Sequence, residues 1–161
     1  MKKILKLMLM FLLICSIWVN PIIVHAEEHS SDFEEVSADQ INVLASSRGN
    51  LATLSEPSLD MCDLGIGISS NGIGVSYTTR ATTTATEIGV KNMVLQEKTL
   101  LGWKDIVIRD HYNYDTDYYA GSVVYLKAEA GKTYRVYCTH YAIIDDVEYT
   151  LYNITDSIVY N

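Results

Sequence analysis

Beyond Gly49, apolar and polar residues alternate with a period of two over short stretches that are separated by turn residues. These stretches are rich in valine, isoleucine, threonine and tyrosine. Successive side chains of a strand point to opposite faces of a sheet, and β-branched and aromatic residues suit that position. The pattern therefore predicts strands throughout residues 51–161, with no helix-period segment between them.

The clearest predicted element is a β-hairpin in the stretch LGIGISSNGIGVSYTT, residues 64–79. Asn71 and Gly72 tolerate the positive φ angles of a two-residue type I′ turn. Such a turn pairs Ile68 with Val75 and places the alternate apolar residues of both strands on one face. Glycines occupy the opposite face, where we expect another segment of backbone to pack closely.

Six further strands are predicted where the alternation resumes, and glycines or pairs of polar residues mark the turns between them. They cover residues 87–98, 103–109, 118–128, 132–142, 148–154 and 158–160. No connection is long enough for the crossover helix that parallel strands need. We therefore predict an all-β antiparallel fold of about seven to eight strands, arranged as a β-sandwich or a partly closed barrel.

The first 26 residues have the pattern of a secretory signal peptide. Their start is basic, residues 7–19 carry no charge, and Val24-His25-Ala26 suits cleavage after Ala26. An uncleaved membrane anchor is the alternative, because residues 7–26 are about as long as a membrane-spanning helix. Asn20 and Pro21 interrupt the apolar run and favour the cleaved signal.

Cleavage after Ala26 divides the chain into three parts. Residues 1–26 are the signal, residues 27–50 an acidic lead-in, and residues 51–161 a single β domain. We expect the lead-in to be mobile, apart from a short helical turn near Ala38 to Ala45. The predicted location is outside the cell, either in the medium or loosely associated with the envelope.

The charge of the chain limits its partners. Cleavage would remove Lys2, Lys3 and Lys6 and no acid, which changes the net charge from −8 to −11. Such a charge repels nucleic acid and anionic lipid, so we expect neither nucleic acid nor, after cleavage, a membrane as partner. Neutral glycans, cationic partners, metal ions and plain solubility are all compatible with it.

Two cysteines remain after the signal, Cys62 and Cys138, and their positions in the alternation place both side chains inward. Export places them where thiols can oxidise. A bond between them would close a loop of about 77 residues and stabilise the domain by about 4 kcal/mol in the chain-entropy model. We predict this disulfide, with two separate buried thiols as the alternative.

The sequence contains no recognised catalytic constellation. It has neither a Gly-x-Ser-x-Gly elbow nor a His-Glu-x-x-His motif. Cys138 with His140 or His111 as its base would make the protein a small extracellular hydrolase, but a thiol in an apolar core is inert. We expect no enzymatic activity and no cofactor.

Residues 110–119 contain three acids, an asparagine and four tyrosines, and we expect them to form a loop between two strands. An EF-hand calcium loop is ruled out because Tyr118 stands where such a loop needs glycine and Val124 where it needs glutamate. A looser calcium site and a solvated acidic loop both remain open, and no metal site is predicted.

Aromatic side chains suggest a binding surface instead. Tyrosine and tryptophan present a flat apolar face with a polar rim, which suits sugar rings or a protein partner. Tyrosines that simply cover half-exposed strands are the alternative. The candidate ligand-binding residues are Trp103, Tyr112, Tyr114, Tyr118 and Tyr119.

The runs LQEKTLLGW, residues 95–103, and GKTYRVYCTHYAIIDDVEYTLYN, residues 131–153, resemble a family of small secreted proteins of unknown function from Gram-positive bacteria. That family combines an export signal, a Leu-Gln-x-Lys strand, a turn with tryptophan and a Gly-x-x-Tyr-Arg strand. The resemblance covers about residues 60–160 and implies a secreted β domain, with no catalytic residue to carry over. The residues themselves predict that Trp103 caps one end of the core and that Arg135 faces outward beside Tyr137.

Together these observations predict a secreted, non-enzymatic module that binds an extracellular glycan or protein through exposed aromatic residues. A secreted toxin or antimicrobial protein is the alternative. Its negative charge opposes direct attack on anionic membranes, so a toxin of this kind would need a protein receptor. The small hydrolase is the second alternative.

Overall fold

The computed structural model describes residues 32–48 and 58–161, which form one antiparallel β-sheet of nine strands and a short 3-10 helix. The elements are β1 (Phe33–Glu35), η2 (Ala38–Gln40), β2 (Asn42–Arg48), β3 (Leu59–Ser69), β4 (Gly72–Thr99), β5 (Gly102–Val107), β6 (His111–Tyr125), β7 (Thr133–Ile144), β8 (Val147–Ile154) and β9 (Ile158–Val159). The predicted all-β antiparallel fold is confirmed, and the sheet is open. The predicted signal peptide lies outside the described residues.

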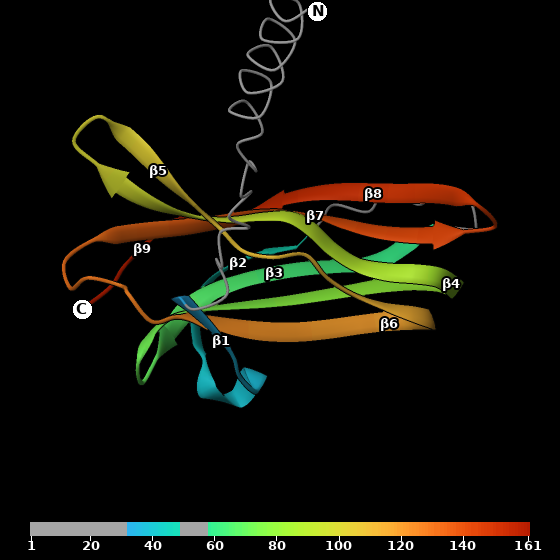
Figure 1. Cartoon of the computed structure of the whole chain (residues 1–161), viewed down its shortest axis with the longest axis horizontal. Coiled ribbons are helices and arrows are strands. Elements are labelled where there is room, and N and C mark those ends of the chain that lie inside the picture. Colours follow the sequence, from blue (N-terminus) through green and yellow to red (C-terminus); the bar gives the residue numbers. More distant parts are fainter. Residues whose placement is uncertain (1–31, 49–57) are drawn as a thin grey trace, which may run out of the picture.

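The long strand β4 organises the sheet (Figure 1). Its first part pairs with β3, its last part pairs with β7 and β5, and β6 runs beside it from Ile73 to Val90. Between Arg80 and Ala85 the register of β4 against β6 shifts, and Asp115 on β6 has a positive φ of 53°. Both strands fold back at this corner, so one sheet forms two layers.

The two layers face each other across the core (Figure 1). The lower layer contains β1, β2, β3, residues 72–80 of β4 and residues 118–125 of β6. The upper layer contains β5, β7, β8, β9, residues 85–99 of β4 and residues 111–116 of β6. Side chains that point between the layers are called inward below, and the others outward.

Inward side chains form two apolar clusters. The larger includes Leu64, Ile66, Val75, Leu95 and Val136, all fully buried. The smaller lies toward the corner and includes Cys62, Ala85 and Ile88. Each fully buried side chain of the size of valine or leucine contributes about 1.5 to 3 kcal/mol. The period-two pattern of the sequence therefore identified the inward face of the sheet correctly.

The β3–β4 hairpin has a different register from the one predicted. Ile68 pairs with Ile73 rather than with Val75, because the turn lies one residue earlier and Gly72 belongs to the strand. A Cβ on Gly72 would lie 2.0 Å from the carbonyl oxygen of Tyr125, so β6 can pair closely there only with glycine. The shift of two positions leaves the inward face unchanged.

The glycine-rich face of this hairpin is covered as predicted. A Cβ on Gly67 would lie 2.1 Å from the backbone carbonyl oxygen of Asn42, the first residue of β2. Ile41, just before β2, is buried on the same face. Another segment of backbone therefore packs directly on the glycines.

Residues 32–48, assigned above to a mobile lead-in, are part of the sheet. β1 pairs with β6, and β2 pairs with β3 at one edge. The predicted helical turn is η2, in which the Ser37 amide donates to Gln40 Oε1 at 2.9 Å. Within the described ranges, no helix is long and apolar enough to cross a membrane.

Candidate functional site

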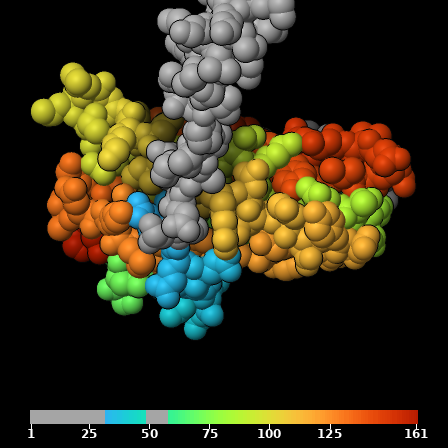
Figure 2. Space-filling model, in the orientation of Figure 1, coloured from blue at the N-terminus to red at the C-terminus, as the bar shows by residue number. Residues whose placement is uncertain are grey.

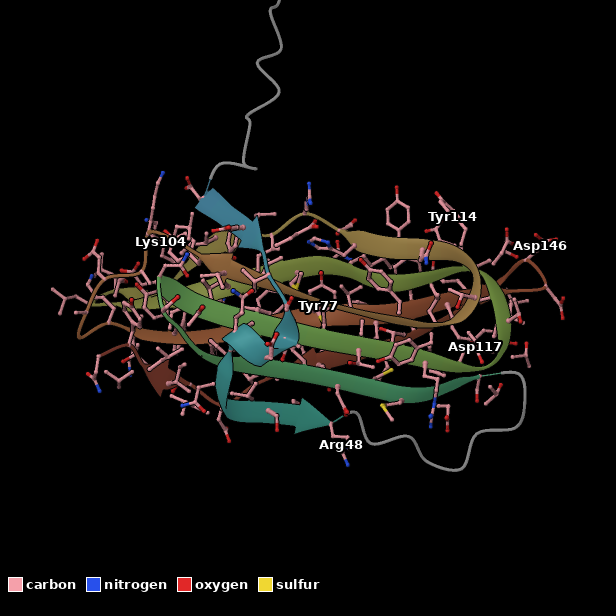
Figure 3. The ribbon with its side chains drawn as sticks, turned by 90° about the horizontal axis from the view of Figure 1, so that it is seen from below. Arg48, Tyr77, Lys104, Tyr114, Asp117 and Asp146 are labelled. Carbon is pink, nitrogen blue, oxygen red and sulfur yellow. The ribbon has the colours of Figure 1, made fainter. Side chains whose placement is uncertain are left out.

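The predicted binding residues do not form one site. Tyr112 and Tyr114 point outward from the upper layer near the corner, and Tyr118 points outward from the lower layer. Trp103 also lies on the outer face of the upper layer, but on β5, at the other end of the molecule. Figure 3 shows this separation through Tyr114 and through Lys104, the neighbour of Trp103.

Tyr119 points inward and is half-buried between the layers. Its ring centroid lies 6.1 Å from that of Tyr77, and it contacts both apolar clusters. Burial raises the pKa of its hydroxyl. Tyr119 therefore packs within the fold, whereas Tyr112 and Tyr114 expose about half of their side chains and meet edge to face at 5.5 Å.

Residues 111–119, expected to form a loop, belong to strand β6. Asp110 lies just before this strand, whereas Asp115, with a positive φ of 53°, and Asp117 lie where the strand turns the corner. Among residues 32–48 and 58–161, no group of three or more His, Cys, Asp or Glu side chains could hold a metal ion. The acidic segment is a strand at the corner of the sheet rather than a loop.

A different group of outward side chains does come together on the upper layer. We call it the aromatic platform, and it comprises Trp103 of β5, Gln96 of β4, Arg135 and Tyr137 of β7, and Tyr152 of β8. These four strands are neighbours in the order β5, β4, β7, β8. The rings of Tyr137 and Tyr152 lie 5.8 Å apart between centroids.

Polar contacts fix the other half of the platform. Arg135 Nε donates to Gln96 Oε1 at 2.7 Å, and Gln96 Nε2 donates to Asp105 Oδ1 at 2.6 Å. The guanidinium carbon of Arg135 lies 4.1 Å from the centroid of the Trp103 ring. A cation stacked on an indole near the surface contributes about 0.5 to 1 kcal/mol, and the hydrogen bond to Gln96 holds the guanidinium of Arg135 in place against the ring.

The platform corrects one expectation and supports another. Trp103 belongs to neither apolar cluster, so it does not cap the core; it lies against Arg135 instead. Arg135 does face outward beside Tyr137, as its position in the alternation predicts. Gln96 and Tyr152 were not singled out from the sequence, because only the pairing of β4 and β8 with β7 places them here.

A buried polar network joins the two layers behind the platform. His140 Nδ1 lies 2.7 Å from Thr79 Oγ1, and that hydroxyl donates to the carbonyl oxygen of Gly89 at 3.0 Å. Because the Thr79 hydroxyl donates its proton to Gly89, its oxygen accepts a hydrogen bond from the imidazole. His140 therefore carries its proton on Nδ1.

Asn153 completes this network. Its Nδ2 donates to the Cys62 carbonyl oxygen at 2.8 Å and lies 3.3 Å from His140 Nε2, which accepts. Its Oδ1 accepts from Ser47 Oγ at 3.1 Å. The network thus links β2 and β8, two of the edge strands of the sheet, and uses both nitrogens of a neutral histidine.

Cys62 and Cys138 are free thiols in the structure, so the predicted disulfide is not formed. Cys62 lies on β3 in the lower layer and Cys138 on β7 in the upper layer, and both are completely buried. Burial raises the pKa of each thiol to about 12. A thiol of that pKa is a poor nucleophile near neutral pH, and the nitrogens of His140 contact Thr79 and Asn153.

Comparisons with protein-family models, with curated proteins and with solved structures found no match to this chain. The resemblance to a family of small secreted proteins therefore stays a prediction.

Proposed function

We propose that the protein is a non-enzymatic extracellular module that binds a glycan on the aromatic platform. The observation that supports this proposal most strongly is the row of outward aromatic and planar polar side chains across four adjacent strands. Tyr152, at one end of the row, is 58% exposed, although its ring packs against that of Tyr137.

The chemistry of the platform suits a sugar. One face of a pyranose ring is lined with C–H groups that stack on an aromatic ring, and its edge carries hydroxyls that need polar partners. Trp103, Tyr137 and Tyr152 supply the rings, while Arg135, Gln96 and Asp105 supply donors and acceptors beside them. Tyrosine and tryptophan combine both properties in one side chain.

The platform is also rigid before any ligand binds. Its side chains project from paired strands, and each of the five contacts at least one other member of the platform. Preorganised groups lose less conformational entropy on binding. Neighbouring strands lie about 4.8 Å apart, so the row from β5 to β8 extends about 14 Å, which fits an oligosaccharide better than a single sugar.

Glycan arrays and envelope polysaccharide fractions test the proposal with the purified wild type. We expect affinity that falls at least about fivefold in Tyr152→Ala and in Tyr137→Ala, because truncation of an aromatic side chain that carries the binding costs more than about 1 kcal/mol. Tyr118→Ala is the matched control, since Tyr118 is 50% exposed but lies on the other layer. Circular dichroism establishes that all three variants are folded.

Two results would contradict the proposal. One is a wild type that binds no glycan on either the arrays or the envelope fractions. The other is an equal loss of affinity in Tyr118→Ala and Tyr152→Ala, which would place the ligand elsewhere.

A further inference from the structure

The β4–β5 hairpin ends in two leucines that nothing in the described structure covers. Leu100 and Leu101 are fully exposed, at 105% and 101% of their reference areas, more than any other large apolar residue in the described ranges. The hairpin stands out from the body at the upper left of Figures 1 and 2. Turns normally carry glycine, asparagine or aspartate at such positions, so the turn itself does not require leucine.

The residues beside the two leucines have a charge opposite to that of the whole chain. Residues 98–104 contain Lys98 and Lys104 and no acid, whereas the chain has a net charge of −8. Trp103 belongs to the same segment, and the ammonium of Lys98 lies 6.0 Å from its ring centroid. The tip thus combines an apolar end, an indole and two cations.

This combination matches a lipid–water interface. Leucine side chains partition into the acyl region, tryptophan concentrates at the level of the headgroups, and lysine interacts with phosphate while its stem stays in apolar surroundings. We propose that the tip of the β4–β5 hairpin, residues 98–104, inserts into the interface of a bilayer that contains anionic phospholipid. The negative charge predicted above to exclude membranes is a property of the whole chain and not of this tip.

The shape of the molecule makes the contact specific to the tip. Strand β7 pairs with β4 only as far as Glu97, so the hairpin beyond that residue has no third strand beside it. Two residues on each side of the turn extend about 7 Å at the rise of a strand. That distance is close to the Debye length, which is about 10 Å at 0.1 M salt. When the tip touches the bilayer, salt therefore screens much of the repulsion between the acidic body of the protein and the anionic lipid.

The fluorescence of Trp103 reports directly on insertion of the tip into a bilayer. The chain from Glu27 onward contains every described residue, including all residues of both apolar clusters, and lacks Trp18, so Trp103 is its single tryptophan. With vesicles of equal phosphatidylglycerol and phosphatidylcholine, we expect co-sedimentation, a blue shift of Trp103 emission and quenching by brominated acyl chains. Binding to pure phosphatidylcholine vesicles should be weaker, because these vesicles lack the anionic headgroups that attract Lys98 and Lys104.

The double variant Leu100→Ser/Leu101→Ser should lower the vesicle partition coefficient by at least about tenfold. The variant lacks the favourable free energy of transferring two leucine side chains from water into the acyl region. Val147→Ser is the matched control: Val147 is half-exposed on β8 and should leave the coefficient unchanged. Both variants should keep the wild-type circular dichroism spectrum, since neither position contributes to the core.

The proposal is overturned by a wild type that neither sediments with phosphatidylglycerol vesicles nor shifts its emission. It is also overturned by equal partitioning of the wild type and the double leucine variant. A third outcome would also overturn it: the wild type does not bind vesicles but dimerises in sedimentation equilibrium, and the double variant is a monomer. The tip would then bind a second copy of this chain and not lipid.

Discussion

His140 is the buried residue whose protonation state the fold controls most directly. Burial lowers its pKa to about 4, and its two nitrogens already have partners that suit only the neutral ring. Sequence alternation places His140 inward correctly, but Thr79 and Asn153 are 61 and 13 positions away along the chain. The sequence suggested a base for Cys138, whereas the structure shows a neutral linker between strands.

Stability should therefore decrease as the pH falls below 6.5. Between the ordinary histidine pKa of about 6.5 and a folded-state value of about 4, the unfolded chain binds a proton that the folded chain does not. His140 accordingly stabilises the fold fully above pH 7, and about 3 kcal/mol of that contribution is lost by pH 4. Urea unfolding from pH 7.5 to pH 4.5 measures the change.

The variant His140→Gln isolates this contribution. It should be less stable than the wild type at pH 7.5 and should show a smaller loss toward pH 4.5, because the titrating group is gone. His111→Gln is the comparison, since it leaves the His140 network in place and removes a second buried histidine whose pKa is also lowered by burial. Equal pH dependence in His140→Gln and the wild type would show that His140 is not the group responsible.

Among the strands, the edge strand β2 depends on the glycines beneath it. In Gly67→Ala the new methyl group would meet the backbone of Asn42, which cannot rotate away. Forced packing of this kind typically costs about 1 to 3 kcal/mol, and we expect the loss to appear as faster hydrogen exchange in residues 42–48 and a lower free energy of unfolding.

Gly65→Ala is the matched control on the same strand face. Its methyl group would lie 2.6 Å from Ser76 Oγ, a side-chain atom that a rotation can move. We therefore expect Gly65→Ala to lower the free energy of unfolding less than Gly67→Ala does. A Gly67→Ala variant as stable as Gly65→Ala would mean that β2 can shift away from β3 without cost.

Strands with one buried face were predicted well, and strands without one were missed. The predicted segments 87–98 and 148–154 fall within β4 and β8, and the segment 132–142 starts one residue before β7; the inward positions of these strands alternate clearly. β1 has three residues and none of them is buried, so it carries no hydrophobic pattern. The corner of β4 is rich in exposed threonine, which made one long strand look like two.

The arrangement of the whole sheet decides which surface residues meet. Trp103 and Tyr152 are 49 positions apart, and the order β5, β4, β7, β8 brings their strands together on one face. Tyr112 is only nine positions from Trp103 along the chain, yet it lies toward the other end of that face. Local alternation assigns a side chain to a face but not to a neighbour, so the platform was not predictable without the strand order.

The two cysteines provide a test at the scale of the molecule, because Cys62 and Cys138 lie in different layers. As free thiols with a pKa near 12, they should not react with a thiol reagent at pH 8 while the protein is folded. Unfolding the chain from Glu27 onward without reductant should release two thiols, and its mass should not change on reduction. If no thiol appears and the mass rises by about 2 Da, the layers are joined by the bond expected from the sequence, with a stabilisation of about 4 kcal/mol.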